Sequence, residues 1–386
     1  MKKSLIALAV MAAAGAASAQ SSVTLFGIVD ATLAHGRANG AGNANKTQLA
    51  NSGYNSSRLG FRGTEDLGGG MSASFWLEGS LANDDGSAGQ RIPVGNQAAL
   101  NGGVTADGAG LVFNRRSTVS LAGNWGELRL GRDYTPTFWN LTIFDPFGTN
   151  GVGTTLTSAG PGTGLASPAA TGTFVPVGTR NVLVRASNDV GYFLPANLGG
   201  IYGQVNYWFG ENNQNGAVTE DDGRGYGLRV GYGAGPFNVA IAYAKTDYGV
   251  TAPGVGGDYT TWNIGGQWDF GMAKVMAQFA KDQKDSTTEI DGRGWLIGAL
   301  VPVGAGEIRA SYSTYKIDSG AGADPRTAQF ALGYVHNLSK RTAVYATVAH
   351  ARNKNGASYA LNGATVAAGA VNFRTTGYDL GIRHSF

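Results

Sequence analysis

Hydrophobic and polar positions alternate strictly in the last eleven residues of the chain, 376–386. On one face, every second position is apolar, aromatic or histidine: Tyr378, Leu380, Ile382, His384 and Phe386. Glycine and polar or charged residues fill the positions between them. A period of two residues predicts a β-strand whose two faces meet different surroundings. An apolar face with aromatic ends is typical of a strand that faces lipid while its polar face lines an aqueous lumen.

The same alternation, interrupted by glycine-rich breaks, predicts sixteen strands in all. We expect them at 23–35, 57–67, 71–81, 115–124, 127–134, 187–194, 201–210, 225–232, 237–248, 259–270, 274–284, 294–303, 307–317, 327–337, 342–352 and 376–386. An even number of strands is typical of a bacterial outer-membrane barrel. It also places both ends of the chain on the same side of the membrane.

The breaks between these strands alternate in length. Short breaks are expected at 68–70, 125–126, 234–236, 271–273, 304–306 and 338–340. Long breaks are expected at 36–56, 82–114, 135–186 and 353–375. Short turns on one rim and long loops on the other are typical of an antiparallel up-and-down barrel. The predicted fold class is therefore all-β, a transmembrane antiparallel 16-stranded β-barrel.

The amino-terminal segment has the three parts of a secretory signal peptide. Lys2 and Lys3 give a basic start, residues 5–10 are apolar, and an A-x-A cleavage site ends at Ala19. The alternative, an amino-terminal membrane anchor, is disfavoured because the apolar run is too short to span a bilayer. We expect residues 1–19 to be removed and residues 20–386 to form a single barrel domain.

Composition narrows the class further. Only 14% of the residues are charged, and no segment after residue 19 approaches the roughly 20 consecutive apolar residues of a transmembrane helix. Two of the 29 basic residues lie in the signal peptide, which leaves 27 against 26 acidic residues, so net charge says little about partners. With no cysteine, the chain has no disulfide framework and no thiolate metal site. We expect no metal and no cofactor.

Other classes of function fit the sequence less well. A hydrolase needs a nucleophile, a base and an orienting group, and none of the four histidines lies in a recognisable nucleophile motif. Nucleic-acid binding has no support, because no basic run is present. A soluble secreted β-protein has no reason to sort its loops by length. An outer-membrane adhesin or receptor barrel without significant conductance stays open, because the loops 36–56 and 82–114 could bind partners.

Several motifs occur in the order typical of one known family. The most specific is SRLGFRGTEDLG at 57–68, and it is followed by NRRS at 114–117 and LRLGR at 128–132. With the terminal Phe386, they make the chain resemble the trimeric general porins of Gram-negative outer membranes, in their betaproteobacterial and neisserial branch. The resemblance implies a homotrimer in outer-membrane lipid, with a water-filled channel for small hydrophilic solutes. Phe386 also resembles the terminal signal that such barrels show to their assembly machinery.

In porins the loop after the fifth strand folds into the barrel and narrows it. Here that loop is 135–186, and it carries an apolar cluster that includes Phe138, Trp139 and Phe147. A long loop with its own apolar cluster favours packing against a surface over exposure to solvent. We therefore expect a loop folded into the lumen as a constriction. The alternative is a variable loop on the cell surface.

The resemblance also implies arginines on the wall across from this loop. Arg58, Arg115 and Arg185 match the family positions, and parity puts Arg62 on the face of Arg58. With the alternatives that the sequence leaves open, the expected constriction residues are Arg58, Arg62, Arg115, Arg116, Arg180 and Arg185. Local alternation does not decide which of Arg115 and Arg116 faces the lumen.

The charges of these residues predict a preference for small anions. Guanidinium groups stay charged at any working pH, and on one wall they draw anions into a narrow aqueous path. Asp145, within the loop, is expected to oppose the arginines and to create a transverse field. Ile28 stands where the family often has a basic residue. Further carboxylates with lumenal parity temper the preference: Glu127, Asp133, Asp269, Glu307 and Asp379.

Overall fold

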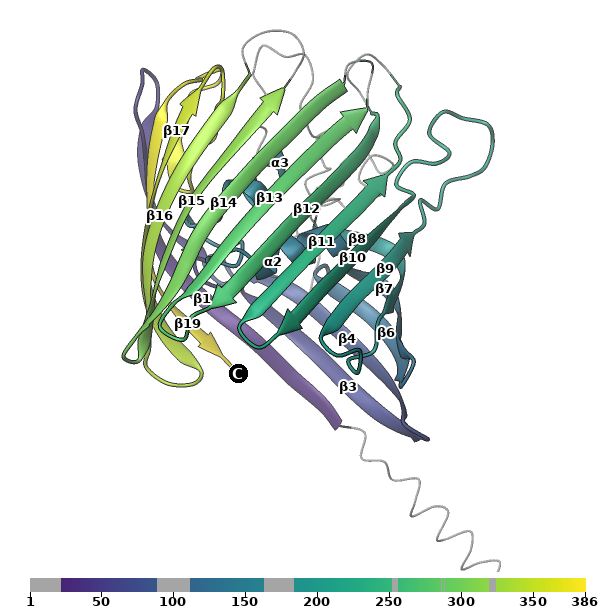
Figure 1. The fold of residues 1–386 in the computed structure, drawn as a ribbon. Coiled ribbons are helices and arrows are strands. Elements are labelled where there is room, and N and C mark those ends of the chain that lie inside the picture. Colours follow the sequence, from purple (N-terminus) through teal and green to yellow (C-terminus); the bar gives the residue numbers. More distant parts are fainter. Residues whose placement is uncertain are drawn as a thin grey trace, which may run out of the picture.

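The computed structural model describes residues 22–88, 112–162, 184–251, 256–285, 287, 289–318 and 324–386. The expected signal peptide and Arg180 lie outside these ranges. A single antiparallel sheet closes on itself (Figure 1), because β1 (Ser22–Ala38) pairs with β19 (Arg374–Ser385). Closure gives the first and last wall strands partners on both sides, so the barrel has no free sheet edge in the membrane.

Sixteen strands form the wall of the barrel. Between β1 and β19 they are β3 (Arg58–Gly68), β4 (Met71–Ala82), β6 (Arg116–Gly123), β7 (Gly126–Tyr134), β8 (Arg185–Phe193), β9 (Ile201–Trp208), β10 (Gly225–Ala234), β11 (Phe237–Thr246), β12 (Asp258–Asp269), β13 (Lys274–Asp285), β14 (Glu289–Val303), β15 (Gly306–Asp318), β16 (Arg326–Asn337) and β17 (Thr342–Lys354). The shorter strands β2 (Ala44–Asn51), β5 (Ser87–Ala88) and β18 (Ala364–Thr365) lie in loops at one end. Each predicted strand overlaps a wall strand, which confirms the predicted fold class.

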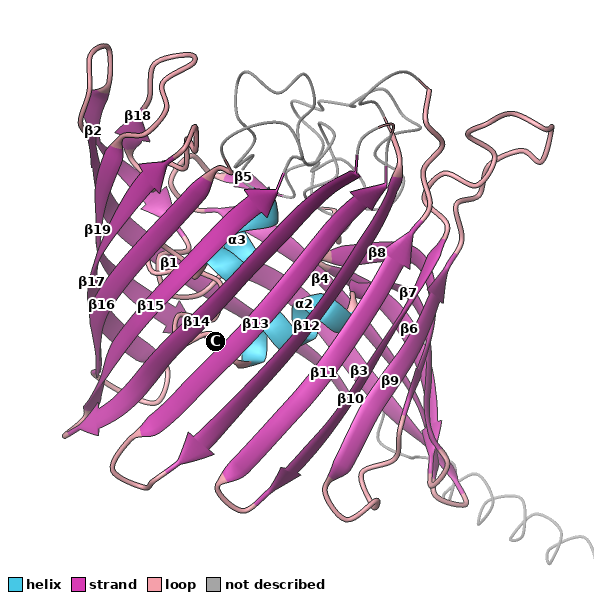
Figure 2. Ribbon diagram, turned by 45° about the horizontal axis from the view of Figure 1, so that its top comes forward, coloured by secondary structure: helices cyan, strands magenta, loops and turns pink. Residues whose placement is uncertain are grey.

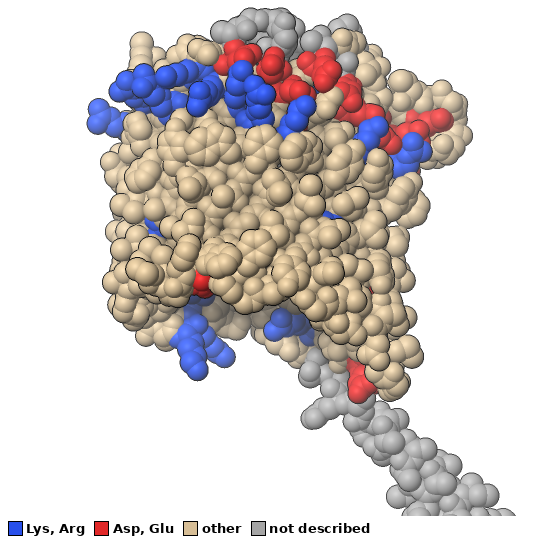
Figure 3. Space-filling view, viewed as in Figure 1, with Lys and Arg blue, Asp and Glu red and all other residues tan. Residues whose placement is uncertain are grey.

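Side chains that point out of the wall are mostly apolar, and those that point into the barrel are mostly polar. On β1, Leu25 and Leu33 are 54% and 50% exposed, whereas Asp30 is completely buried. On β19, Leu380 points outward and its neighbour Asp379 inward. The outer surface is a broad belt almost free of charge (Figure 3), as expected for a wall that faces lipid.

The two rims of the barrel differ in the length of their connections. Short turns lie at the rim where β1 begins and β19 ends, and longer loops lie at the opposite rim (Figure 1). In the turn between β3 and β4, Gly68, Gly69 and Gly70 have φ of 79°, 61° and 78°. Glycine adopts such angles without the steric cost that other residues carry. The predicted sorting of short and long connections is therefore confirmed.

One wall strand begins earlier than the sequence predicts. The predicted strand begins at residue 294, but β14 begins at Glu289 and includes Gly292 and Gly294. Both glycines instead make room for the buried ring of Tyr315 on the neighbouring strand. A Cβ atom at Gly292 would lie 2.0 Å from the Tyr315 hydroxyl oxygen, and one at Gly294 would lie 2.6 Å from its ring. Here glycine serves close packing rather than a turn.

Two short helices lie inside the barrel, α2 (Pro136–Ile143) and α3 (Leu156–Gly162) (Figure 2). Thr135 caps α2 by accepting a hydrogen bond from Phe138 N at 3.3 Å, and Pro136 occupies the first turn. Within the described residues, no helix is long and apolar enough to cross a membrane. The part of the loop that the structure describes is folded into the lumen, as the sequence predicted.

Candidate functional site inside the barrel

Polar side chains of the wall hold the first half of the lumenal loop. Asn140, in α2, is completely buried and donates a hydrogen bond from Nδ2 to Ala240 O at 2.9 Å. Its Oδ1 accepts a hydrogen bond from Arg229 Nε at 2.9 Å. Gln278 on β13 donates from Nε2 to Leu141 O at 3.0 Å. These bonds satisfy buried polar groups on both partners, so they fix where α2 lies on the wall.

The described segment that follows α2 is held in the same way by β15, β16 and β19. Asp379 Oδ2 accepts a hydrogen bond from Val152 N at 2.7 Å. Ser313 Oγ accepts one from Leu156 N at 3.0 Å, and Gln329 Nε2 donates to Thr154 O at 2.9 Å. Asp379, which the sequence identified as a lumenal acid, therefore binds the loop backbone.

Wall glycines let the loop lie close against the strands. A Cβ atom at Gly265 would come within 2.3 Å of the Phe144 ring, and one at Gly298 within 2.5 Å of Pro146. Each of five alternate strands contributes one such glycine beneath the loop: Gly227, Gly265, Gly298, Gly333 and Gly377. We call these residues the glycine track. It removes side-chain volume from the wall where the loop crosses it.

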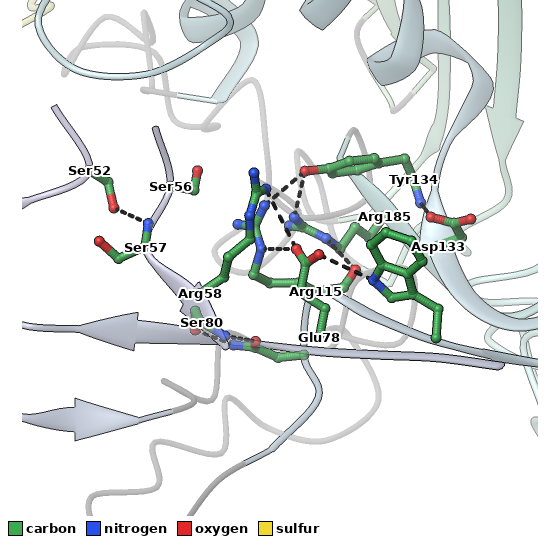
Figure 4. A network of polar contacts seen from close by, with 12 residues as sticks. Ser52, Ser56, Ser57, Arg58, Glu78, Ser80, Arg115, Asp133, Tyr134 and Arg185 are labelled. Carbon is green, nitrogen blue, oxygen red and sulfur yellow. Dashed lines mark hydrogen bonds and ion pairs between the residues drawn. The ribbon is translucent and has the colours of Figure 1, made fainter. Parts of the chain in front are cut away.

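Two arginines, Arg58 and Arg115, contact one carboxylate, that of Glu78 on β4, and Arg185 on β8 is joined to them through Tyr134 (Figure 4). Glu78 Oε1 lies 2.5 Å from Arg115 Nε and 3.7 Å from Arg58 Nη1. The hydroxyl of Tyr134 accepts hydrogen bonds from Nη2 of Arg115 and of Arg185, each at 3.1 Å. The arginine cluster, as we call Arg58, Arg115 and Arg185, thus carries three positive charges around one negative charge.

Both Arg115 and Arg116 face the lumen, because both line the same cavity. Arg116 points inward by ordinary alternation, on the same face as the buried Thr118. Arg115 precedes β6, and its backbone N donates to Glu78 O at 3.0 Å. The cavity has a volume of about 370 Å³, and the two arginines line it together with Arg58, Glu78 and Trp139 of the loop.

Arg116 is balanced differently from Arg58 and Arg115, the two other arginines that line the cavity. Arg116 Nε lies 3.6 Å from Asp133 Oδ2, and its guanidinium group stacks 4.7 Å from the centre of the Trp76 ring. Asp133 in turn lies 2.6 Å from Arg129 Nη1. Arg62 is exposed on the same wall, with its guanidinium carbon 5.1 Å from the Trp76 ring centre. The excess of positive charge therefore lies with the arginine cluster.

The structure corrects the expectation for Asp145. Its side chain is buried within the loop and does not face the arginines across water. Its carboxylate accepts hydrogen bonds from Phe147 N at 2.8 Å and from Thr155 Oγ1 at 3.0 Å. Burial raises the pKa of Asp145 above its ordinary value. The residue closes a turn of the loop, because its carboxylate satisfies amide and hydroxyl donors that would otherwise be unpaired.

Sequence reasoning missed Glu78 and a second aromatic–arginine group around Tyr54. Glu78 could have been found from the two-residue period, because it lies two positions after Trp76 and therefore on the same, lumenal face of β4. Tyr54 could not, because it lies in a segment that was expected to be a surface loop. Its amide N donates to Asp30 Oδ2 at 2.9 Å, and its hydroxyl accepts from Arg309 Nη2 at 3.0 Å. The carboxylate of the buried Asp30 thus holds this segment against the wall.

A closed barrel of sixteen strands is wide enough to leave an aqueous channel, so the fold defines a membrane channel protein. Residues 5–356 match the model of the Gram-negative porin family, and the chain belongs to this family. It is 41% identical to Outer membrane porin protein 32 of Delftia acidovorans across the full length of both chains. It is 29% identical, again over both full lengths, to an outer membrane porin protein of Bordetella pertussis.

Comparison with a solved structure shows the same fold. The anion-selective porin from Comamonas acidovorans superposes with a TM-score of 0.78 at 36% identity, covering 95% of this chain and 100% of that one. The present chain is therefore an outer-membrane porin, a channel for small hydrophilic solutes and ions rather than an enzyme.

Proposed function

We propose that this porin prefers small anions and that the arginine cluster sets the preference. The observation that carries the proposal is that Arg58 and Arg115 share the single carboxylate of Glu78, while Arg185 joins them through the Tyr134 hydroxyl. Three guanidinium groups and one carboxylate leave a positive potential at the cavity that Arg58 and Arg115 line. The low-dielectric protein and lipid around the lumen strengthen that potential. A related porin of known structure is described as anion-selective.

The geometry suits passage rather than tight binding. Glu78 neutralises part of the positive charge, and Tyr134 uses its hydroxyl to hold two of the guanidinium groups in place. The remaining positive charge attracts an anion. The anion is not bound tightly, because N–H donors of the arginines already make hydrogen bonds within the protein. Conduction requires sites that are favourable to enter and easy to leave. Arg62, Arg116 and Arg180 belong to the proposed pore lining as flanking charges.

We also propose that the loop 135–186 is the constriction. The support is its described half, which α2 and α3 place inside the barrel and which the wall holds by hydrogen bonds. Trp139 of this loop lines the same cavity as Arg58 and Arg115. The loop and the cluster would then border the same narrow part of the channel.

Assembly belongs to the same proposal. We expect a homotrimer embedded in outer-membrane lipid, as in the general porins that the sequence resembles. We expect Phe386 to be read by the barrel assembly machinery during insertion. Its support is that the Phe386 ring is 43% exposed on the outer face at the strand end that closes the barrel.

Replacement of the arginine cluster tests the proposed selectivity. The triple variant R58S/R115S/R185S should shift the reversal potential in a salt gradient towards cations, because three positive charges are lost while the negative charge of Glu78 remains. The measurement is planar-bilayer recording at several salt gradients. The variant K340S/R341S, which removes two exposed cations from a short turn, is the control and should keep the wild-type reversal potential. An unchanged reversal potential in the triple variant would exclude the cluster as the selectivity element.

A further inference from the structure

The end of the first long loop turns into the barrel and lies against the wall. We call residues 52–57 the inward segment; they directly precede Arg58 on β3 (Figure 4). Asp30 of β1, whose side chain is completely buried, holds the backbone of this segment. Its Oδ2 accepts hydrogen bonds from Tyr54 N at 2.9 Å and from Asn55 N at 2.6 Å. A buried carboxylate requires such donors, so these bonds fix the segment on the lumenal face.

The inward segment also contacts the loop 135–186. Ser56 Oγ donates a hydrogen bond to Asn150 Oδ1 at 2.7 Å. The two backbones are also close together, because a Cβ atom at Gly151 would lie 2.1 Å from Gly53 O. The inward segment therefore joins the lumenal loop to the wall strand β1.

The ring of Tyr54 lies against two arginines of the wall, Arg309 on β15 and Arg383 on β19. Their guanidinium carbons lie 4.5 Å and 5.2 Å from the centre of the ring. The Tyr54 hydroxyl accepts a hydrogen bond from Arg309 Nη2 at 3.0 Å. Arg309 lies on the face of β15 opposite to the outward Tyr312, and Arg383 is directly opposite Asp30 in the strand register. Both arginines therefore belong to the lumenal face.

The two arginines differ in their acidic partners. Arg309 Nε lies 2.9 Å from Glu307 Oε1. Within the described part of the chain, no ion pair joins Arg383 to a carboxylate, and its buried Nε has no hydrogen-bond partner. The face of an aromatic ring is the negative part of its quadrupole and attracts a guanidinium group. Tyr54 thus offsets part of the positive charge of both arginines and shields them from the lumen.

We propose that the inward segment is a second constriction element and that Tyr54 is a specificity-determining residue of the channel. Because the ring lies against Arg309 and Arg383, less of their charge acts on passing ions. Only β1 separates Arg383 on β19 from Arg58 on β3, so the arginine cluster and the Tyr54 group act on the same stretch of the lumen. The proposal rests on the channel function, but not on the proposed role of the arginine cluster.

Planar-bilayer recordings of Y54A test the proposal. Loss of the ring uncovers two guanidinium groups and widens the path, so the anion-to-cation permeability ratio should rise about twofold and single-channel conductance should increase. In the background R309Q/R383Q, where the ring has no charge to cover, Y54A should leave the ratio unchanged. The matched control Y312A removes a tyrosine of β15 that is 39% exposed on the outer face. It should keep the wild-type ratio and conductance.

The variant Y54F separates the ring from its hydroxyl. It keeps the ring and removes only the acceptor for Arg309, so the ratio should rise less than in Y54A and the conductance should stay at the wild-type value. An unchanged ratio in both Y54A and Y54F would overturn the proposal, as would an equal rise from Y54A with and without the two arginines. Unchanged conductance in Y54A would remove the segment from the constriction. The triple variant R58S/R115S/R185S keeps the Tyr54 group intact, so the two tests fail independently.

Discussion

Glu78 determines how the arginine cluster acts on its surroundings. Its side chain is 10% exposed and lies between the guanidinium groups of Arg58 and Arg115. A carboxylate at this place allows several like charges to stay close together, since each repulsive pair is partly offset by an attractive one. It also reduces the net positive potential that a passing anion meets. The position of Glu78 therefore limits the positive potential that the three arginines create.

The variant E78Q should raise the preference for anions. The amide keeps the shape of the side chain but removes the negative charge, so the anion-to-cation permeability ratio should rise roughly twofold or more. Reversal potentials in graded salt measure this ratio. The control E65Q makes the same change at an exposed acid of β3 that shares the outward parity of Leu59 and Phe61, and it should leave the ratio unchanged. A ratio in E78Q that stays the same or falls would show that Glu78 does not temper the cluster.

At the scale of elements, the lumenal loop and the wall are shaped for each other. The wall supplies hydrogen-bonding side chains such as Gln278 and Asp379 for the loop backbone, and the glycine track supplies space. Loop residues Phe144 and Val152 are almost completely buried against this track. Packed surfaces of this kind resist added volume, because the surrounding atoms have few empty spaces to move into.

Substitution G265A should displace the loop from the wall. The added Cβ atom would lie 2.3 Å from the Phe144 ring, and overpacking of this kind costs about 1–3 kcal/mol. We expect lower single-channel conductance with larger current fluctuations, because the loop is pushed towards the centre of the lumen. Gly266 is the matched control: it is the next residue of β12, and a Cβ atom there would meet its nearest neighbour at 3.5 Å. Identical recordings for G265A and G266A would contradict this role of the track.

At the scale of the whole molecule, closure of the sheet depends on the last strand. Phe386 exchanges two backbone hydrogen bonds with Gly27, each 3.1 Å long. Gly27 lacks a side chain where the Phe386 ring lies, and a Cβ atom there would come within 2.4 Å of that ring. The terminal residue therefore has a structural role in the seam as well as its proposed role in assembly.

Replacement of Phe386 by serine should lower the amount of assembled barrel several-fold. The measurement is the heat-modifiable, folded fraction in isolated outer membranes. Phe270 is a suitable control, because it is an aromatic residue near the short-turn rim that is 61% exposed. F270S should assemble nearly as well as wild type, since it removes a similar apolar area away from the terminus. Equal losses in F386S and F270S would point to lipid contact rather than a terminal signal.

The alternation of apolar and polar residues was sufficient to predict the strands and which of their side chains point into or out of the barrel. It correctly placed Arg58 inward and Leu380 outward, because side chains alternate with a fixed period in any strand, but it did not decide between Arg115 and Arg116. It failed where the chain leaves that regularity. The period says nothing about Arg115, which precedes its strand, or about Asp145, whose partners are donors of the loop itself.

The sequence by itself determined that this chain is a porin barrel with a long loop after its fifth strand, because strand period and loop length are local properties. Only the tertiary structure decided which charges meet. Glu78, Arg115 and Arg185 are far apart in the chain, and the strand register brings them together. Register is fixed by pairing along the whole barrel, so no single segment contains it.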